Sequence, residues 1–352
     1  MYLNIDFEKN RHLLQLKYEG ISKVKAINLE NMEIMISNKS GEMDYKEIEH
    51  PSTVHWGQRK LLLSEIYFLM RCSKKGNLVI YAGAAPGTHI ELLSQLFPTL
   101  QFILVDPSSF QINESNKISI INDYFTLELI DKLPINNREV LFISDIRRCG
   151  YQACKSMSQY NKFFTEDMEM QQQWVVKLRP KYSLLKFKLP FGDGFTEYLK
   201  GEIHFPIFGR QNTSESRLLV SSEDNFAKIL YSNRYYERRM AYFNMVTRVS
   251  YYIHDIKTVK GLDHCYDCAS EVRILTQYLN KFKKHDTTVE DLSNLITTQI
   301  NISKTAQRTL ATVIPPHKRT LWFNSETENI NYTPTPSDRR YIMNILGEKK
   351  YM

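Results

Sequence analysis

The sequence has no long apolar segment and few cysteines, and both absences narrow the class of protein. No apolar run approaches the roughly 18 residues needed to span a bilayer, so we expect no membrane partner. The five cysteines among 352 residues are an odd and scattered set, which suits a reducing compartment. Residues 1–8 lack a basic start followed by an apolar stretch, so the sequence predicts no secretory signal.

Motifs of several enzyme classes are also missing. The chain has no Gly-x-Ser-x-Gly motif and no ordered Ser, His and Asp set of the hydrolase type. Cys265 and Cys268 have the Cys-x-x-Cys spacing of a zinc half-site or a redox pair, but Cys72, Cys149 and Cys154 offer no second matching pair. We therefore expect no metal. The sequence contains no internal repeat and no low-complexity block.

A mild excess of positive charge accompanies many aromatic residues. The formal net charge is +7, which favours a polyanionic partner such as RNA. The 21 tyrosines and 18 phenylalanines matter here because single-stranded bases stack on aromatic faces beside Lys and Arg. The length exceeds the usual single-domain size of about 100–200 residues, so we expect one elaborated domain or a domain with appendages.

The stretch 78–90 reads as a strand, a tight turn and a helix, and the rest of the chain is organised around it. Gly83 and Gly87 allow a sharp turn and a close approach to a ligand, and helix N–H groups follow them. The next predicted strand, 101–105, ends in Asp106, about 20 residues beyond the turn, where a carboxylate accepts ribose hydroxyls. The pattern favours an adenosine-type cofactor. The missing third glycine argues against NAD.

Further strands and helices alternate along the chain. Strands are predicted at 118–121, 140–144 and 182–189, with a helix at 156–174 between the last two. This alternation predicts a doubly wound α/β domain. Asp145 follows one of these strands, so it and Asp106 should face the same cleft, at the carboxyl ends of parallel strands.

Two lysines occupy the last of these strands. A lysine in a buried strand is costly without a partner, and the alternation puts Lys186 and Lys188 on one face, so spacing alone does not choose between them. Apolar residues at 62, 63, 66, 69 and 70 predict an amphipathic helix before the first strand. Lys60 lies in its first turn, where the helix dipole disfavours a cation.

Five motifs in order carry a resemblance to a known family. They are Gly57-Gln-Arg-Lys-Leu-Leu-Leu63, Tyr81-Ala-Gly-Ala-Ala-Pro-Gly-Thr-His89, Ile143-Ser-Asp-Ile146, Leu185-Lys-Phe-Lys-Leu-Pro-Phe-Gly-Asp193 and Ser214-Glu-Ser-Arg-Leu-Leu219. Together they resemble the poxvirus-type cap-specific mRNA 2′-O-methyltransferases that also serve as poly(A) polymerase regulatory subunits. The likeness runs from about residue 45 to residue 275.

The resemblance implies a fold, an organisation and a location. The fold would be the α/β, Rossmann-like fold of S-adenosylmethionine-dependent methyltransferases, with N-terminal and C-terminal additions. The two ends of the chain lie outside the resemblance, so we expect an N-terminal extension at 1–44 beside the 2′-O-methyltransferase domain at 45–284. Beyond about 285 the composition changes to Thr, Asn, Lys and Pro, which predicts a C-terminal appendage at 285–352 with a helix at 288–312. The protein would act in the cytoplasm, at a viral replication site or in the virion.

The resemblance also places a catalytic tetrad on Lys60, Asp145, Lys186 and Glu215. It selects Lys186 as the base. A ribose 2′-OH is a very weak acid, so its attack on the methyl group of S-adenosylmethionine needs an aligned base. A lysine can act so only if its pKa is lowered, and burial beside a second lysine has that effect.

The same likeness implies the residues that bind each ligand. Cofactor contacts would come from Gln58, Tyr81, Gly83, Gly87, His89, Asp106, Phe125 and Asp145, with His89 either touching the cofactor or packing the helix. The methylated cap would be held by Tyr45, Lys188, Phe191, Asp193, Glu215 and Glu237, because a cationic base stacks well between two aromatic rings with carboxylates at its edge. The chain departs from the family after Asp106, where residues 107–109 replace an expected arginine.

Two other functions stay open at this point. The chain could be a processivity partner of a poly(A) polymerase catalytic subunit, with catalysis secondary or lost. It could also be a 2′-O-methyltransferase of the ribosomal-RNA type, which has the tetrad and lacks the cap site. Intact tetrad residues favour an enzyme, and Tyr45, Phe191, Asp193 and Glu237 distinguish capped mRNA from ribosomal RNA as the substrate.

Overall fold

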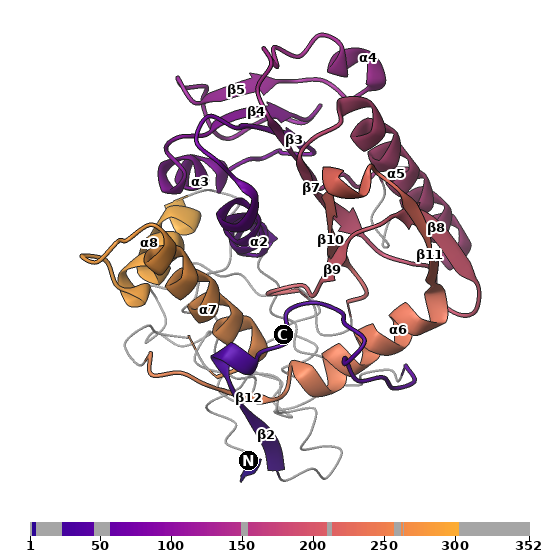
Figure 1. Cartoon of the computed structure of the whole chain (residues 1–352), viewed down its shortest axis with the longest axis vertical. Coiled ribbons are helices and arrows are strands. Elements are labelled where there is room, and N and C mark those ends of the chain that lie inside the picture. Colours follow the sequence, from indigo (N-terminus) through magenta and orange to yellow (C-terminus); the bar gives the residue numbers. More distant parts are fainter. Residues whose placement is uncertain are drawn as a thin grey trace, which may run out of the picture.

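A seven-stranded sheet forms the centre of the protein, in the strand order β5-β4-β3-β6-β7-β10-β9 (Figure 1). The computed structural model describes residues 2–4, 23–45, 57–148, 154–209, 213–256, 262 and 264–302. The strands of the sheet are β3 (Leu78–Ala82), β4 (Gln101–Val105), β5 (Ile118–Ile121), β6 (Val140–Ser144), β7 (Tyr182–Phe187), β9 (Glu202–His204) and β10 (Ser216–Ser221).

The sheet is parallel over its first five strands. β4 and β6 flank β3 in parallel, and β5 and β7 extend the sheet on either side. β10 runs antiparallel to β7, and β9 runs antiparallel to β10. The strand order reverses at β3, the place where open α/β sheets bind ligands beyond the carboxyl ends of their strands. The α/β, Rossmann-like fold class predicted from the sequence is confirmed.

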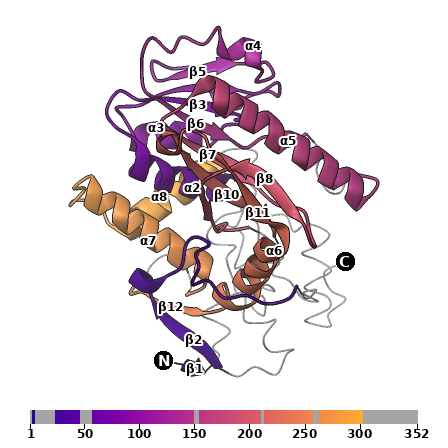
Figure 2. The same cartoon turned by 45° about the vertical axis from the view of Figure 1, so that its right-hand side comes forward.

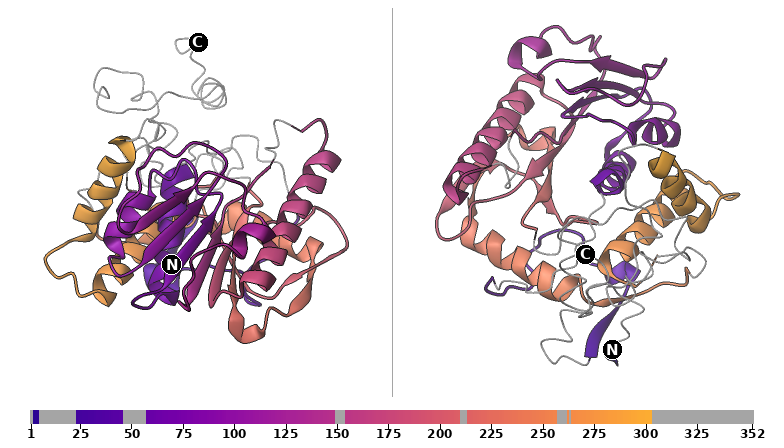
Figure 3. Two further views of the ribbon diagram at one scale, coloured as in Figure 1. Left: turned by 90° about the horizontal axis from the view of Figure 1, so that it is seen from above. Right: turned by 180° about the vertical axis from the view of Figure 1, so that it is seen from behind.

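Helices cover both faces of the sheet (Figures 1 and 3). One face is covered by α2 (Gly57–Cys72), α3 (Ile90–Leu96), α7 (Tyr266–Lys281) and α8 (Val289–Ile302), and the other by α4 (Leu127–Ile130), α5 (Met157–Leu178) and α6 (Asn233–Tyr242). Alternate residues of β3 enter the two cores, Val79 on the α2 side and Ile80 on the α5 side. Burial on both faces explains why β3 is apolar throughout.

Helix α2 is fixed from two directions. The five apolar residues predicted to form its buried stripe are all buried, which confirms the predicted face. On its other side the Arg59 guanidinium donates from Nε to Glu271 of α7 at 2.8 Å. Ser293 of α8 donates to the same carboxylate at 2.6 Å. This buried ion pair joins the first turn of α2 to α7 and α8.

Smaller elements complete the described chain (Figure 2). A three-stranded sheet contains β1 (Tyr2–Asn4), β2 (Lys23–Asn28) and β12 (Tyr251–Ile253), and a two-stranded sheet contains β8 (Phe195–Leu199) and β11 (Lys228–Ser232). The single-turn helices are η1 (Leu29–Asn31) and η3 (Ser222–Asp224), and η4 (Phe243–Thr247) is π-helical.

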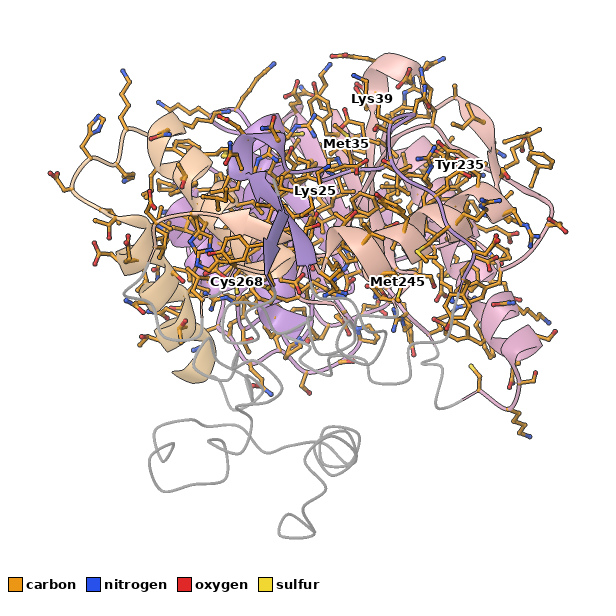
Figure 4. All side chains as sticks on the ribbon, turned by 90° about the horizontal axis from the view of Figure 1, so that it is seen from below. Lys25, Met35, Lys39, Tyr235, Met245 and Cys268 are labelled. Carbon is orange, nitrogen blue, oxygen red and sulfur yellow. The ribbon has the colours of Figure 1, made fainter. Side chains whose placement is uncertain are left out.

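Residues 32–36, an apolar-rich run, lie in the segment after β2, where Figure 4 labels Met35. It pairs with β9 through one antiparallel bridge, between Met35 and His204. The helix predicted at 288–312 is α8 as far as Ile302, and the rest of that prediction lies outside the described residues. Within the described ranges, no helix has both the length and the apolar character needed to cross a bilayer.

Candidate active site

The predicted glycine turn lies between β3 and α3. Gly83 and Gly87 have φ angles of 78° and 72°, a backbone region that side chains other than glycine adopt with strain. A Cβ on Gly83 would lie 2.9 Å from the backbone nitrogen of Ile146, so the loop after β6 packs directly on this turn. Glycine at these positions therefore lets the turn adopt its backbone angles and lets the loop after β6 approach it closely.

Asp106 lies beside the turn, at the end of β4. Its Oδ2 accepts the backbone N–H of Ala85 at 3.2 Å, and its Oδ1 accepts that of Ser108 at 2.8 Å. An ionised carboxylate accepts about four hydrogen bonds, so capacity remains for a pair of ribose hydroxyls. The segment 107–109 stands where the family has an arginine, and here the backbone N–H of Ser108 contacts the Asp106 carboxylate.

Three of the predicted cofactor residues form a buried network beneath the turn. His89 contacts Gln58 Oε1 through Nδ1 at 2.8 Å and Glu65 through Nε2 at 2.9 Å. Tyr81 donates its hydroxyl to Glu65 at 2.8 Å. The side chains of Tyr81 and His89 are fully buried, so they support the turn from the α2 side. Sequence reasoning gave Glu65 no role.

The two remaining predicted cofactor residues come from the segments after β5 and β6, Phe125 from the first and Asp145 from the second. The Phe125 ring is buried and packs edge to face on Trp174, with ring centroids 5.0 Å apart. Only the backbone near Phe125 can therefore meet a ligand without disturbing the core. Asp145 follows β6, and its backbone N–H donates to Ala82 at 3.0 Å, which fixes this residue next to Gly83.

The four residues of the predicted tetrad lie together at the carboxyl end of the sheet. Lys60 of α2 donates to Glu215 at 2.8 Å. Lys186 of β7 lies 3.0 Å from the Asp145 carboxylate and 3.1 Å from its backbone oxygen. All four side chains are less than one-fifth exposed. The geometry joins two lysine–carboxylate pairs in one cluster.

Two arginines that sequence reasoning missed complete this cluster. Arg217 donates to Asp145 at 2.6 Å and lies 3.5 Å from Glu215, so it links the two pairs. The strand register places Arg217 directly opposite Lys186. Arg147 also pairs with Glu215. The signal for Arg217 was its two-residue spacing from Glu215, which puts both side chains on one side of the strand.

The cluster perturbs the proton affinities of its members. Burial, helped by the positive charge of Arg217, lowers the pKa of Lys60 to about 7. Burial also lowers the pKa of Lys186 to about 7. The negative charge of Asp145 opposes this shift, and the positive charges of Arg147, Arg217 and Lys60 add to it. Burial alone would raise the pKa of Asp145, but the charges of Lys186 and Arg217 hold it well below its usual range. Near neutral pH the lysines can therefore exchange a proton.

A pocket lies next to the tetrad, and its lining contains part of the predicted cap site. Its walls include Tyr45, Phe191 and Glu237, with Asn244 behind them. The rings of Tyr45 and Phe191 have centroids 6.2 Å apart and are tilted by 51°. A planar base stacks about 3.5 Å from each ring, so these rings would have to become parallel and separate to about 7 Å. Glu237 accepts the backbone N–H of Gly192 at 2.7 Å.

The other predicted cap residues lie around this pocket. Lys188 lies over the Tyr160 and Phe191 rings, 4.4 and 4.9 Å from their centroids. Burial and the charge of Arg147 lower the pKa of Lys188 to about 8. Asp193 is 88% exposed and lies 3.5 Å from Arg234, outside the pocket wall. Glu215, also predicted to contact the cap, pairs instead with Lys60 and Arg147.

The Cys-x-x-Cys pair has a structural role at the start of α7. Cys265 is the N-cap residue, and its sulfur accepts the backbone N–H of Cys268 at 3.5 Å. Across the described ranges, no three His, Cys, Asp or Glu side chains come together as the ligands of a metal would.

The fold and the site together define an α/β protein with a glycine turn after β3 and a buried lysine–carboxylate cluster at the carboxyl end of the sheet. The family described as "Poly A polymerase regulatory subunit" matches residues 30–303. The chain belongs to this family, which confirms the resemblance drawn from the five motifs.

Several relatives carry a more specific name. A fowlpox virus (strain NVSL) protein named "Cap-specific mRNA (nucleoside-2′-O-)-methyltransferase" is 30% identical over 232 residues, which cover 59% of this chain and 74% of the relative. A myxoma virus (strain Lausanne) protein of the same name is 27% identical over 214 residues, covering 55% of this chain and 62% of the relative. The chain thus spans under two-thirds of the myxoma relative's length.

One solved structure also overlaps the chain. It is described as "The structure of bluetongue virus VP4 reveals a multifunctional RNA-capping production-line". The overlap covers 66% of this chain and 43% of the other, with a TM-score of 0.38 and 11% identity.

The role of Arg217 can be tested by titration. In an Arg217→Gln variant we expect the Lys186 pKa to rise above its value of about 7, because a neighbouring positive charge is lost and Asp145 is released. NMR of protein with ¹³C-labelled lysines measures this midpoint. Arg217→Lys keeps the charge and should titrate close to wild type. An unchanged midpoint in Arg217→Gln would contradict the linking role.

Proposed function

We propose that this chain transfers a methyl group from S-adenosylmethionine to the ribose 2′-OH of the first transcribed nucleotide of 7-methylguanosine-capped mRNA. The observation that carries this proposal is the cluster of Lys60, Asp145, Lys186 and Glu215 next to the glycine turn. The names of the fowlpox and myxoma relatives support it. Because those relatives are viral, we place the activity in the cytoplasm, at a viral replication site or in the virion.

S-adenosylmethionine would supply an electrophilic methyl group, and the chain's residues supply its binding and the proton acceptor. Asp106 is placed to accept the ribose hydroxyls. Gly83 and Gly87 let the backbone approach the ligand, and the backbone near Phe125 would lie beside the adenine. Gln58, Tyr81 and His89 hold the turn from beneath. These residue types fit an adenosine with an amino-acid tail.

Lys186 acts as the general base in this proposal. With a pKa of about 7, much of Lys186 is neutral at physiological pH and can accept the proton of the 2′-OH. Asp145 orients the Lys186 amine through the 3.0 Å contact. Lys60 and Glu215 form the second pair, and the positive charges of Arg147, Arg217 and Lys60 favour the neutral form of Lys186.

The cap would bind between Tyr45 and Phe191, with Glu237 at the guanine edge. Asp193 pairs with Arg234 near this pocket, and Lys188 lies over the Phe191 ring. We keep 45–284 as the proposed catalytic domain, with 1–44 and 285–352 as additions. The Arg59 ion pair joins α8, in the second addition, to the helix that carries Lys60.

Replacing Lys186 should stop the chemistry and spare cofactor binding. Lys186→Met is expected to lower kcat by about 10²- to 10⁴-fold, because the general base is lost. The affinity for S-adenosylmethionine, measured by calorimetry, should stay within about twofold, since Lys186 faces the acceptor hydroxyl. In the wild type, kcat should rise with pH and level off above about 7, where the lysine is neutral.

Lys162→Met is the matched control, because Lys162 is 75% exposed on α5. It should behave as wild type in both assays. Activity of Lys186→Met within a few fold of wild type would remove Lys186 from the role of base.

The cap pocket can be tested through its preference for a cationic base. Tyr45→Ala or Phe191→Ala should reduce the preference for methylated over unmethylated cap by about tenfold, because each aromatic face attracts a cation by about 0.5–2 kcal/mol. Binding of uncapped RNA, which depends on phosphate contacts, should change little. Fluorescence titration with the two cap analogues measures the ratio.

Phe195→Ala serves as the control for this pocket, since Phe195 is 70% exposed and is absent from its wall. Equal affinity of the wild type for both caps would refute the cap pocket. That result would favour the ribosomal-RNA-type reaction instead.

The family description supports a second role, as a processivity partner of a poly(A) polymerase catalytic subunit. In this role the chain would bind the catalytic subunit and lengthen the tails that it makes. Gel filtration of the mixed proteins at micromolar concentration, with a tail-extension assay, tests it. Separate elution together with unchanged tail length would exclude the partner role and leave the methyl-transfer proposal untouched.

A further inference from the structure

Glu65 of α2 is a buried carboxylate that the proposed reaction does not use. Its side chain is 1% exposed, beneath the glycine turn. Oε2 lies 2.9 Å and Oε1 3.1 Å from His89 Nε2. The Tyr81 hydroxyl donates to Oε1 at 2.8 Å. Both oxygens are therefore engaged, and the carboxylate is held in one orientation.

The proton positions in this network follow from its donors and acceptors. Gln58 Oε1 is an acceptor, and it takes the Thr88 hydroxyl at 2.7 Å and His89 Nδ1 at 2.8 Å. Nδ1 of His89 must then carry a proton. Nε2 faces a carboxylate, so a proton also lies between Nε2 and Glu65. The carboxylate is what permits both ring nitrogens of a buried histidine to be hydrogen-bonded in this way.

The orientation of Gln58 is the result that matters for a ligand. Since Oε1 is occupied by two donors, the Nε2 amide group is the side of Gln58 left for other contacts. Among the described residues, no acceptor lies within hydrogen-bonding distance of it. Gln58 lies in the first turn of α2, and Thr88 links it to the glycine turn, so this amide is a donor placed at the edge of the cofactor pocket.

We propose that Glu65 is a positioning residue for the cofactor, and that it acts through His89. Glu65 fixes His89 so that Nδ1 holds the Gln58 oxygen, and the Gln58 amide N–H groups then face an acceptor oxygen of the cofactor, such as its amino-acid carboxylate. This rests on the proposed use of S-adenosylmethionine. Glu65 does not touch the cofactor, so its effect lies in binding and not in the methyl-transfer step.

The test is a Glu65→Gln variant, which keeps the size of the side chain and removes its charge. We expect the Kd for S-adenosylmethionine and for S-adenosylhomocysteine, measured by calorimetry, to rise by about 10- to 100-fold, because a charge-assisted hydrogen bond is lost. The kcat at saturating cofactor should change by less than about threefold. A purely structural role would lower the fraction of active protein and would not separate KM from kcat.

Glu91→Gln is the matched control. Glu91 lies in the first turn of α3, two residues from His89, and is exposed, so the same charge change should leave both Kd values unchanged. A second measurement covers the case in which Glu65→Gln does not fold. ¹⁵N NMR of the wild-type histidines should show His89 protonated at Nδ1, the nitrogen that faces the Gln58 oxygen.

The outcomes separate this inference from the proposed function. If the wild type binds neither compound, the proposed function fails and the inference fails with it. If the wild type binds and folded Glu65→Gln binds equally well, the inference alone is overturned. An unprotonated Nδ1 on His89 in the wild type would likewise overturn it.

Discussion

The burial of two lysines at the carboxyl end of the sheet is the constraint on which the site depends. The cluster sets four cationic side chains, Lys60, Lys186, Arg147 and Arg217, against the two carboxylates of Asp145 and Glu215. This imbalance, together with burial, makes proton loss from a lysine easy, while Asp145, whose pKa the cations hold well below its usual range, keeps Lys186 in place. A group able to accept a proton and a local excess of positive charge thus arise from the same six side chains.

The fold supplies the positions that this cluster needs. The antiparallel register of β7 and β10 puts Arg217 opposite Lys186, and the parallel pairing of β3 with β6 puts Asp145 beside Gly83. Lys60 comes from α2, a helix held by the Arg59–Glu271 ion pair on one side and by Glu65 on the other. The proposed catalytic and cofactor sites therefore share one helix, and its placement sets the geometry of both.

Much of this arrangement could be predicted from the sequence, because it depends on short-range patterns. The glycine turn, Asp106 and the buried stripe of α2 follow from local spacing. The choice between Lys186 and Lys188 does not follow from spacing, because the two lysines share a face of the strand only if the strand extends to residue 188. β7 ends at Phe187, so Lys188 leaves the sheet and turns to the rings of α5. Arg217 and Glu65 were missed because their partners come from strands and turns distant in the sequence.

The central claim is that the methyl group goes to a ribose 2′-OH in capped RNA. The direct measurement uses radiolabelled S-adenosylmethionine, the wild-type protein and two capped RNAs that differ only in having a ribose or a 2′-deoxyribose at the first transcribed nucleotide. Nuclease digestion followed by mass spectrometry locates the methyl group. We predict labelling of the first nucleotide in the ribose RNA and none in the deoxyribose RNA. Equal labelling of both RNAs, or of neither, would contradict the account.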